Sequence, residues 1–146
     1  MKPKFAMYWA ASCGGCEIAV LNTHEKILDV DANFDVVFWP VAMDAKYKDV
    51  EAMEDGSILL TLFNGGIRND ENEHIAKLSR QKSKILVAFG SCACEGCIPG
   101  LANLSPVGDI VYTAFNTIQQ ITRMQFIRAQ VMTYPKVNCI SRLSHE

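Results

Sequence analysis

The stretch Ser12-Cys13-Gly14-Gly15-Cys16 lies where a short apolar run, residues 5–11, gives way to a helical pattern that begins near Cys16. An apolar run of this length is typical of a buried strand, so both thiols fall between the end of a strand and the start of a helix. Because amides at a helix start favour negative charge, we expect both sulfurs to be held as thiolates. The stretch therefore predicts a metal or redox site, with glycines that let the backbone approach a bulky inorganic group.

Strand-like and helix-like segments alternate beyond this stretch. The predicted strands are residues 5–11, 34–39, 57–63 and 84–89, and the predicted helices are residues 16–30, 44–54 and 70–81. Such alternation is typical of right-handed crossover units and of a parallel sheet covered by helices on both faces. The sequence therefore predicts an α/β fold with a parallel sheet of about four strands.

Further candidate site residues follow the third and fourth predicted strands. Asn64-Gly65-Gly66 closes the third strand, and Cys92 comes directly after the fourth. In open parallel sheets, sites lie at the carboxyl ends of the strands. We therefore expect Cys92 to meet Cys13 and Cys16 at one edge of the sheet.

Composition narrows the class of protein. A chain of 146 residues with 49 % apolar residues has the size of one globular domain. Its net charge is −2 and its Lys and Arg are scattered, so we expect no nucleic-acid partner. No apolar run approaches the roughly 20 residues of a membrane span, and the N-terminus shows no cleavable segment, so we expect a cytoplasmic protein. Six cysteines in such a chain favour metal or thiol chemistry over disulfides.

The cysteine spacing by itself leaves several kinds of site open. Cys13-x-x-Cys16 suits a thioredoxin-like dithiol as well as a metal cluster. Together with Cys94-x-x-Cys97 it also gives the number and spacing of cysteines found in structural zinc sites, although such pairs usually occur in small loop-rich modules. Other residues have simpler interpretations: Asn64 is typical of a turn, and Met7, Tyr8 and Trp9 are typical of a core strand.

Several motifs together resemble the small (gamma) subunit of nickel-iron hydrogenases. They are Ser12-Cys13-Gly14-Gly15-Cys16-Glu17, Phe38-Trp39-Pro40, Asn64-Gly65-Gly66-Ile67-Arg68 and Ala88-Phe89-Gly90-Ser91-Cys92-Ala93, with Gly96 to Leu101 beyond them. The resemblance covers residues 4–115 and is strongest to the coenzyme F420-non-reducing (methyl viologen-reducing) branch. The 20 kDa subunit of NADH:ubiquinone oxidoreductases is similar too, but it has adjacent cysteines where this chain spaces Cys13 and Cys16 by two glycines.

The resemblance implies a flavodoxin-like three-layer domain that holds the proximal 4Fe-4S cluster and packs against a large subunit with the nickel-iron centre. Carried over residue by residue, Cys13, Cys16 and Cys92 match three cluster ligands. Cys94 and Cys97 fall at positions that the family does not reserve for ligands, so we expect them to be buried or substitute thiols. Asn64 stands where many relatives have Glu.

The C-terminal part departs from the family pattern. A fourth ligand should be a Cys followed by prolines at the end of a fifth strand, whereas Cys139 is followed by Ile140 and Ser141. We therefore expect residues 1–115 to form the small-subunit-like domain, with residues 116–146 as a divergent tail and the fifth strand lost by C-terminal truncation. An out-of-frame tail would explain the change, and the alternative is a naturally short variant with a helix over residues 113–132.

The sequence thus predicts an iron-sulfur electron-transfer subunit of a nickel-iron hydrogenase. It would pass electrons from H2 oxidation at a partner large subunit to downstream acceptors, with further electron-transfer subunits as candidate partners, and alone it would not be catalytic. One alternative is a thiol-disulfide protein that uses Cys13 and Cys16. The other is a non-catalytic, truncated remnant.

Overall fold

Four parallel strands form a single sheet in the computed structural model of the chain, which describes residues 2–114. The strands are β1 (Lys4–Trp9), β2 (Asp35–Phe38), β3 (Ile58–Asn64) and β4 (Ser83–Phe89). Their order is β2-β1-β3-β4, and each neighbouring pair is parallel. This confirms the predicted α/β class, and the order is that of flavodoxin-like sheets.

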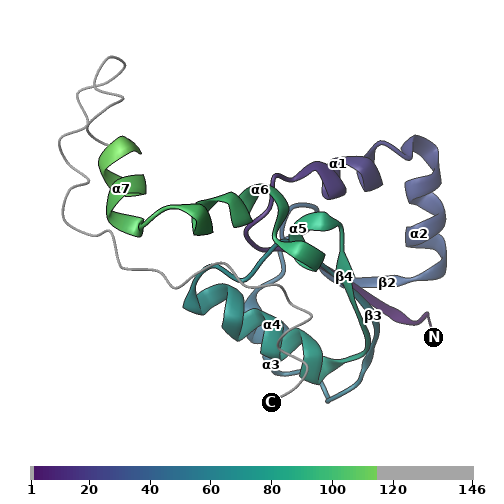
Figure 1. The fold of residues 1–146 in the computed structure, drawn as a ribbon. Coiled ribbons are helices and arrows are strands. Elements are labelled where there is room, and N and C mark those ends of the chain that lie inside the picture. The colour runs from purple at the N-terminus through teal and green to yellow at the C-terminus, as the bar shows by residue number, and fades with distance from the viewer. Residues whose placement is uncertain (1, 115–146) are drawn as a thin grey trace.

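Helices cover both faces of the sheet and make three layers (Figure 1). They are α1 (Gly15–Leu21), α2 (Ile27–Asn33), α3 (Tyr47–Glu51), α4 (Asp70–Lys82), α5 (Ser91–Glu95), α6 (Cys97–Gly100) and α7 (Val107–Tyr112), with 3-10 turns at His24–Lys26 and Leu101–Leu104. Helices α1 and α2 lie over one face, and α3 and α4 lie over the other. The three-layer arrangement is as expected.

The two-residue alternation of a strand divides the core between the layers. In β1, Phe5 and Met7 pack with Trp39 on the side of α1 and α2, whereas Ala6 and Tyr8 belong to the core under α3 and α4. Both faces of β1 are therefore buried, which explains why its sequence is a continuous apolar run rather than an alternating one.

The prediction of one helix over residues 16–30 is wrong. Helix α1 ends at Leu21, and the Thr23 hydroxyl donates a 2.7 Å hydrogen bond to the Val20 carbonyl, which closes the helix end. His24 then adopts a positive φ of 52° before α2 begins. A short polar side chain that bonds back to the backbone competes with helix continuation, so the apolar periodicity spans two helices instead of one.

The other predicted elements are present with shifted ends. Strand β1 ends two residues before the predicted position, and the helix predicted over residues 44–54 is reduced to α3. Helix α4 begins as predicted, with the Asn69 side chain accepting a 2.8 Å hydrogen bond from the Asn72 N–H. The predicted tail over residues 116–146 and the alternative helix over residues 113–132 lie outside the described residues, apart from the first two residues of that helix.

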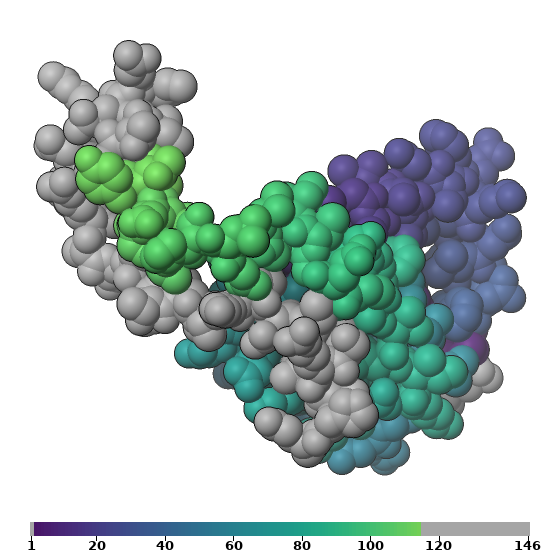
Figure 2. Space-filling view, in the orientation of Figure 1, coloured from purple at the N-terminus to yellow at the C-terminus, as the bar shows by residue number. Residues whose placement is uncertain are grey.

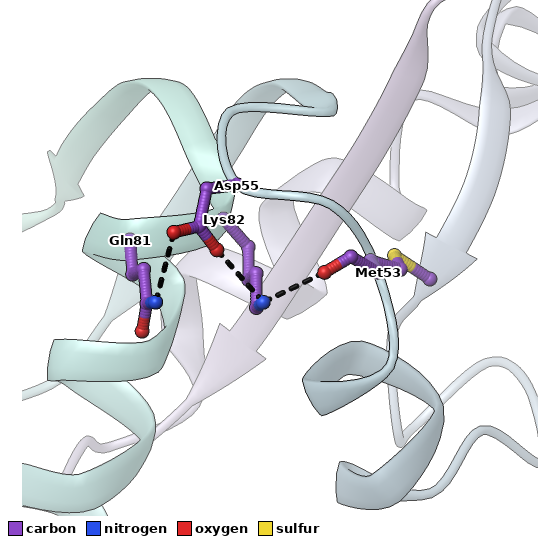
Figure 3. A network of polar contacts seen from close by, with 4 residues as sticks. All are labelled: Met53, Asp55, Gln81 and Lys82. Carbon is purple, nitrogen blue, oxygen red and sulfur yellow. Dashed lines mark hydrogen bonds and ion pairs between the residues drawn. The ribbon is translucent and has the colours of Figure 1, made fainter.

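A polar network fixes the amino end of β3, away from the cysteines (Figure 3). Lys82, at the end of α4, donates hydrogen bonds to the Met53 carbonyl at 2.6 Å and to Asp55 at 2.8 Å. Gln81 donates to the other oxygen of Asp55 at 3.0 Å. The Lys82 side chain is almost completely buried, so this pairing ties α4 to the loop that leads into β3.

Beyond α6 the chain leaves the α/β body. Helix α7 stands apart from the sheet and its covering helices, as Figures 1 and 2 show. Leu101, Leu104 and Tyr112 on this part of the chain are exposed. Within residues 2–114, every helix is too short or too polar to cross a bilayer.

Candidate metal centre at the carboxyl edge of the sheet

The loops after β1 and β3 are tied together at the carboxyl edge of the sheet. The Ala10 N–H donates to the Asn64 carbonyl at 2.7 Å, and Ala11 and Gly66 exchange backbone hydrogen bonds of 3.1 and 2.8 Å. Gly65 has a φ of +102°, and a Cβ there would lie 2.8 Å from the Ala11 carbonyl oxygen. Only glycine allows this approach, which fixes where the cysteine-bearing loop begins.

Asn64 is part of β3, so its interpretation as a turn residue is wrong. Its side chain is fully buried, and Oδ1 accepts a 3.0 Å hydrogen bond from the Ser12 hydroxyl. The Ser12 oxygen in turn accepts a 3.1 Å hydrogen bond from the Gly14 N–H. Asn64 Nδ2 has no hydrogen-bond partner among the described residues. Sequence reasoning missed this Ser12 bridge, which orders the turn between Cys13 and Cys16.

The structure brings the three predicted ligands together. Cys13 lies close enough to the Cys92 thiol for its backbone and its side chain to lower the pKa of that thiol. Gly90, which precedes α5, lies against Cys16: a Cβ at Gly90 would be 2.2 Å from the Cys16 sulfur. The loop after β4 therefore meets both thiols of the loop after β1, as the strand order predicts.

The electrostatics of the thiols differ from the expectation. Burial raises the pKa of the Cys16 thiol, and the nearby thiols of Cys13, Cys92, Cys94 and Cys97 raise it further. The expectation that helix-start amides hold Cys16 as a thiolate is thus wrong, because crowding by four other thiols and burial outweigh them.

The pKa of the Cys92 thiol is shifted in the opposite direction, below its ordinary value. Burial raises the pKa of its thiol, but contacts with the Cys13 backbone and with the side chains of Ser12, Cys13 and Cys97 outweigh it and leave the pKa below the ordinary value. The buried thiol is therefore the one whose thiolate the surroundings favour.

Cys94 and Cys97 were expected to be buried or substitute thiols; both are exposed, so the buried alternative is wrong for both. The Cys94 thiol donates a 3.4 Å hydrogen bond to the Ala88 carbonyl. Cys97 lies at the start of α6, and its side chain helps to lower the pKa of the Cys92 thiol. Five of the six cysteines thus gather at one edge, and Cys139 lies outside the described residues.

A buried carboxyl lies next to this group of thiols. Glu17 is 2 % exposed, and its Oε1 accepts a 3.0 Å hydrogen bond from the indole N–H of Trp39 at the end of β2. Its Oε2 has no hydrogen-bond partner among the described residues. Burial raises the pKa of Glu17, and the Trp39 hydrogen bond opposes this only in part. No sequence spacing links these two residues, so the pair could not be found before the fold was known.

An open hollow of about 440 Å³ adjoins the thiols. Cys13 lines it together with Trp9, Arg68, Ile98 and Pro99. Trp9 is 42 % exposed and donates a long, 3.4 Å hydrogen bond to the Ser12 carbonyl, so its assignment to the core is wrong, whereas Met7 and Tyr8 are buried as predicted. The hollow leaves the Cys13 side of the site accessible, with a rim that is part apolar (Trp9, Ile98, Pro99) and part polar (Arg68).

The donor set suits an iron-sulfur cluster better than a single ion. Among residues 2–114, no group of three or more His, Cys, Asp or Glu side chains is placed to hold one metal ion, which gives the zinc alternative no support. Iron-sulfur clusters are held by Cys thiolates, and thiols are the donors gathered here. The missing Cβ of Gly90 provides the space in which the Cys16 sulfur lies.

With the fold and the thiols in place, comparison with known proteins gives the class. The family described as "NADH ubiquinone oxidoreductase, 20 Kd subunit" matches residues 13–132, and the chain belongs to it. A solved structure of an NAD+-reducing [NiFe]-hydrogenase in the H2-reduced state has a similar fold, with a TM-score of 0.80, 22 % identity, and coverage of 97 % of this chain and 77 % of that one.

More similar relatives lie within the hydrogenase branch of that family. The chain is 47 % identical over 116 residues to an F420-non-reducing hydrogenase iron-sulfur subunit of Archaeoglobus profundus, covering 79 % of this chain and 36 % of that one. It is 37 % identical to an F420-non-reducing hydrogenase subunit of Methanothermobacter thermautotrophicus, covering 78 % of this chain and 35 % of that one. The chain thus spans about a third of the length of these relatives.

Proposed function

We propose that this chain is the cluster-binding part of an iron-sulfur electron-transfer subunit of a nickel-iron hydrogenase. Cys13, Cys16 and Cys92 would serve as thiolate ligands, and residues 1–115 would form the domain that holds the cluster. When bound, a 4Fe-4S cluster would supply a one-electron carrier, loaded twice for each H2 that a partner large subunit oxidises to two protons and two electrons.

The meeting of Cys92 with Cys13 and Cys16 is the observation that carries this proposal. Thiols from two strands that are far apart in sequence reach each other only because β1 and β4 end at the same edge. The low pKa of Cys92 supports a ligand role, because it is the thiolate that binds iron. Gly90 supports it as well, since any side chain there would displace the Cys16 sulfur.

The surroundings of the thiols also suit a partner protein. Trp9 and Ile98 are apolar and exposed, and both line the hollow beside Cys13. Exposed apolar groups around a redox site favour a protein contact, which would exclude water from the thiols. A hydrogenase large subunit is the partner we propose, because the relatives are named as hydrogenase subunits. A cytoplasmic location remains a prediction from the sequence.

The thiol-disulfide alternative has weaker support. An attacking thiol needs thiolate character, and the pKa of Cys16 is raised by burial and by neighbouring thiols, which disfavours Cys16 in that role and leaves it to the exposed Cys13. The truncated-remnant alternative predicts a folded chain that binds no iron and takes up no electrons. Iron content and electron uptake therefore distinguish it from the proposed function.

Electron uptake separates these functions. The anaerobically reconstituted chain is titrated with a reductant of known strength while its visible absorption is followed. A cluster takes up about one electron per chain, whereas a Cys13–Cys16 disulfide takes up about two and shows no iron-dependent absorption. Uptake of two electrons without iron would contradict the proposal in favour of the dithiol. No uptake at all would favour the remnant.

A further inference from the structure

The side-chain amide of Asn64 keeps an unpaired hydrogen-bond donor in the interior of the protein. The residue is 0 % exposed, and its Nδ2 finds no hydrogen-bond partner among residues 2–114. A buried donor that is left unsatisfied is costly, so native structures retain few of them. The donor therefore indicates an acceptor that is not one of the described residues.

The other end of the same amide is fixed by the turn that carries the first two proposed ligands. Asn64 Oδ1 accepts a 3.0 Å hydrogen bond from the Ser12 hydroxyl. Ser12 Oγ already accepts from the Gly14 N–H at 3.1 Å, which leaves its hydrogen for Asn64. A rotation of the amide that moved Nδ2 to Ser12 would break this bond. The chain thus fixes the direction in which the donor is presented.

Asn64 lies at the point of the sheet edge where both ligand-bearing segments begin. It is the last residue of β3, and its register partners, Trp9 on β1 and Phe89 on β4, are the last residues of their strands. The loop after β1 carries two of the proposed ligands, and the segment after β4 carries the third. Ser57 Oγ, which also lacks a partner in the described part of the chain, precedes the amino end of β3 and so lies at the opposite edge.

An iron-sulfur cluster supplies acceptors of the kind that this donor lacks. Its thiolate and sulfide sulfurs carry negative charge, and hydrogen bonds to them help to set the reduction potential. Charge-assisted hydrogen bonds are stronger than those between neutral groups. Because reduction adds one negative charge to the cluster, a nearby N–H donor stabilises the reduced form more than the oxidised form and raises the potential.

We propose that Asn64 Nδ2–H donates a hydrogen bond to a sulfur of the cluster that Cys13, Cys16 and Cys92 would hold, and so raises its reduction potential. This inference rests on the proposed function and adds to it a group that tunes the electron carrier. Asn64 would not bind iron itself, so its loss should change the potential of the cluster and leave its assembly intact.

The first test detects the amide nitrogen directly. The full chain is produced with 15N in its asparagine side chains, reconstituted anaerobically and reduced by one electron, and the 15N hyperfine coupling to the reduced cluster is measured by pulsed EPR. We expect a coupling in the native chain that is absent from Asn64→Asp and retained in Asn72→Asp. Asn72 is the matched control because it is also buried, whereas its Nδ2 donates to the Tyr8 hydroxyl at 3.4 Å.

The second test measures the reduction potential of the same chains. Asn64→Asp keeps an oxygen for the Ser12 hydroxyl and removes the Nδ2 donor, so it should bind about four irons, as the native chain does. At the native midpoint potential, its ratio of reduced to oxidised cluster should be about tenfold lower, as expected for the loss of a hydrogen bond to a charged group. The ratio in Asn72→Asp should stay close to the native one.

Two results would overturn the role of Asn64 and leave the proposed function standing. One is a native chain that binds iron without any 15N coupling, in which case an internal water would take the donor. The other is a coupling and a potential that are unchanged in Asn64→Asp. The labelled native chain gives the first of these results without any variant, so the proposal stays testable if Asn64→Asp does not fold. A native chain that binds no iron would overturn both the role of Asn64 and the proposed function.

Discussion

Replacement of Gly90 by Ala tests whether the Cys16 sulfur lies where the structure places it. A Cβ at Gly90 would lie 2.2 Å from that sulfur, whereas ordinary van der Waals contact begins at 3.4 Å, so the thiol must move by at least about 1.2 Å. Gly90 also has a φ of 85° and a ψ of 167°, a combination essentially restricted to glycine that costs an L residue about 1–3 kcal/mol. Overpacking adds about 1–3 kcal/mol, so we expect Gly90→Ala to lower the free energy of unfolding by about 2–6 kcal/mol.

Gly56→Ala is the control, because it introduces an L residue at a positive φ without the clash. Gly56 has a φ of +67°, and a Cβ added there would have Lys84 Cγ, at 4.0 Å, as its nearest neighbour. We expect a loss of about 1 kcal/mol, since the left-handed cost is partly offset by the reduced entropy of the unfolded chain. The difference between the variants should then be about 1–5 kcal/mol, of which the displacement of the Cys16 sulfur accounts for about 1–3 kcal/mol.

Urea unfolding of both variants, followed by circular dichroism under reducing conditions, measures this difference. Equal unfolding free energies for Gly90→Ala and Gly56→Ala would refute the close packing of Gly90 on Cys16. Since the same displacement moves a proposed ligand, Gly90→Ala should also bind less iron than Gly56→Ala after reconstitution.

Two further substitutions test the polar contacts around the site and the fold. Glu17→Gln should raise the free energy of unfolding at neutral pH by roughly 1 kcal/mol, because it removes a buried carboxylate with one unpartnered oxygen. Because the pKa of Glu17 is raised in the folded chain, its protonated carboxyl stabilises the fold below the unfolded pKa. That contribution to the free energy of unfolding is lost as pH rises through the folded pKa. The urea midpoint of the native chain should therefore fall over this pH range, and that fall should be absent from Glu17→Gln. Asn69→Ala removes the cap on the Asn72 N–H and should cost about 1 kcal/mol in the same assay; an unchanged midpoint would contradict the capping role.

The sheet could be predicted because most of its strands are apolar runs. β1, β3 and β4 are continuously or nearly continuously apolar, and the helices between them require parallel pairing. The same topology predicted that Cys92 would meet Cys13 and Cys16, since this follows from strand order alone. The break between α1 and α2 was missed because the Thr23 hydrogen bond leaves no mark on apolar periodicity.

The polar parts of the site could not be predicted in the same way. The Ser12–Asn64 bond spans 52 positions and the Glu17–Trp39 bond spans 22, so both depend on three-dimensional distances that no local pattern encodes. The error on Cys16 has a similar cause, because its pKa is raised by burial, by Cys13 and by three thiols of the segment after β4, and both the burial and that segment's position depend on the fold.

The most direct test of the central claim is the content of iron and acid-labile sulfide per chain, after anaerobic reconstitution, in the native chain, Cys92→Ser and Cys94→Ser. The account predicts about four irons and four sulfides in the native chain and in Cys94→Ser, and a clear loss in Cys92→Ser. Equal contents in Cys92→Ser and the native chain would contradict it, as would a native chain that folds but binds neither iron nor sulfide.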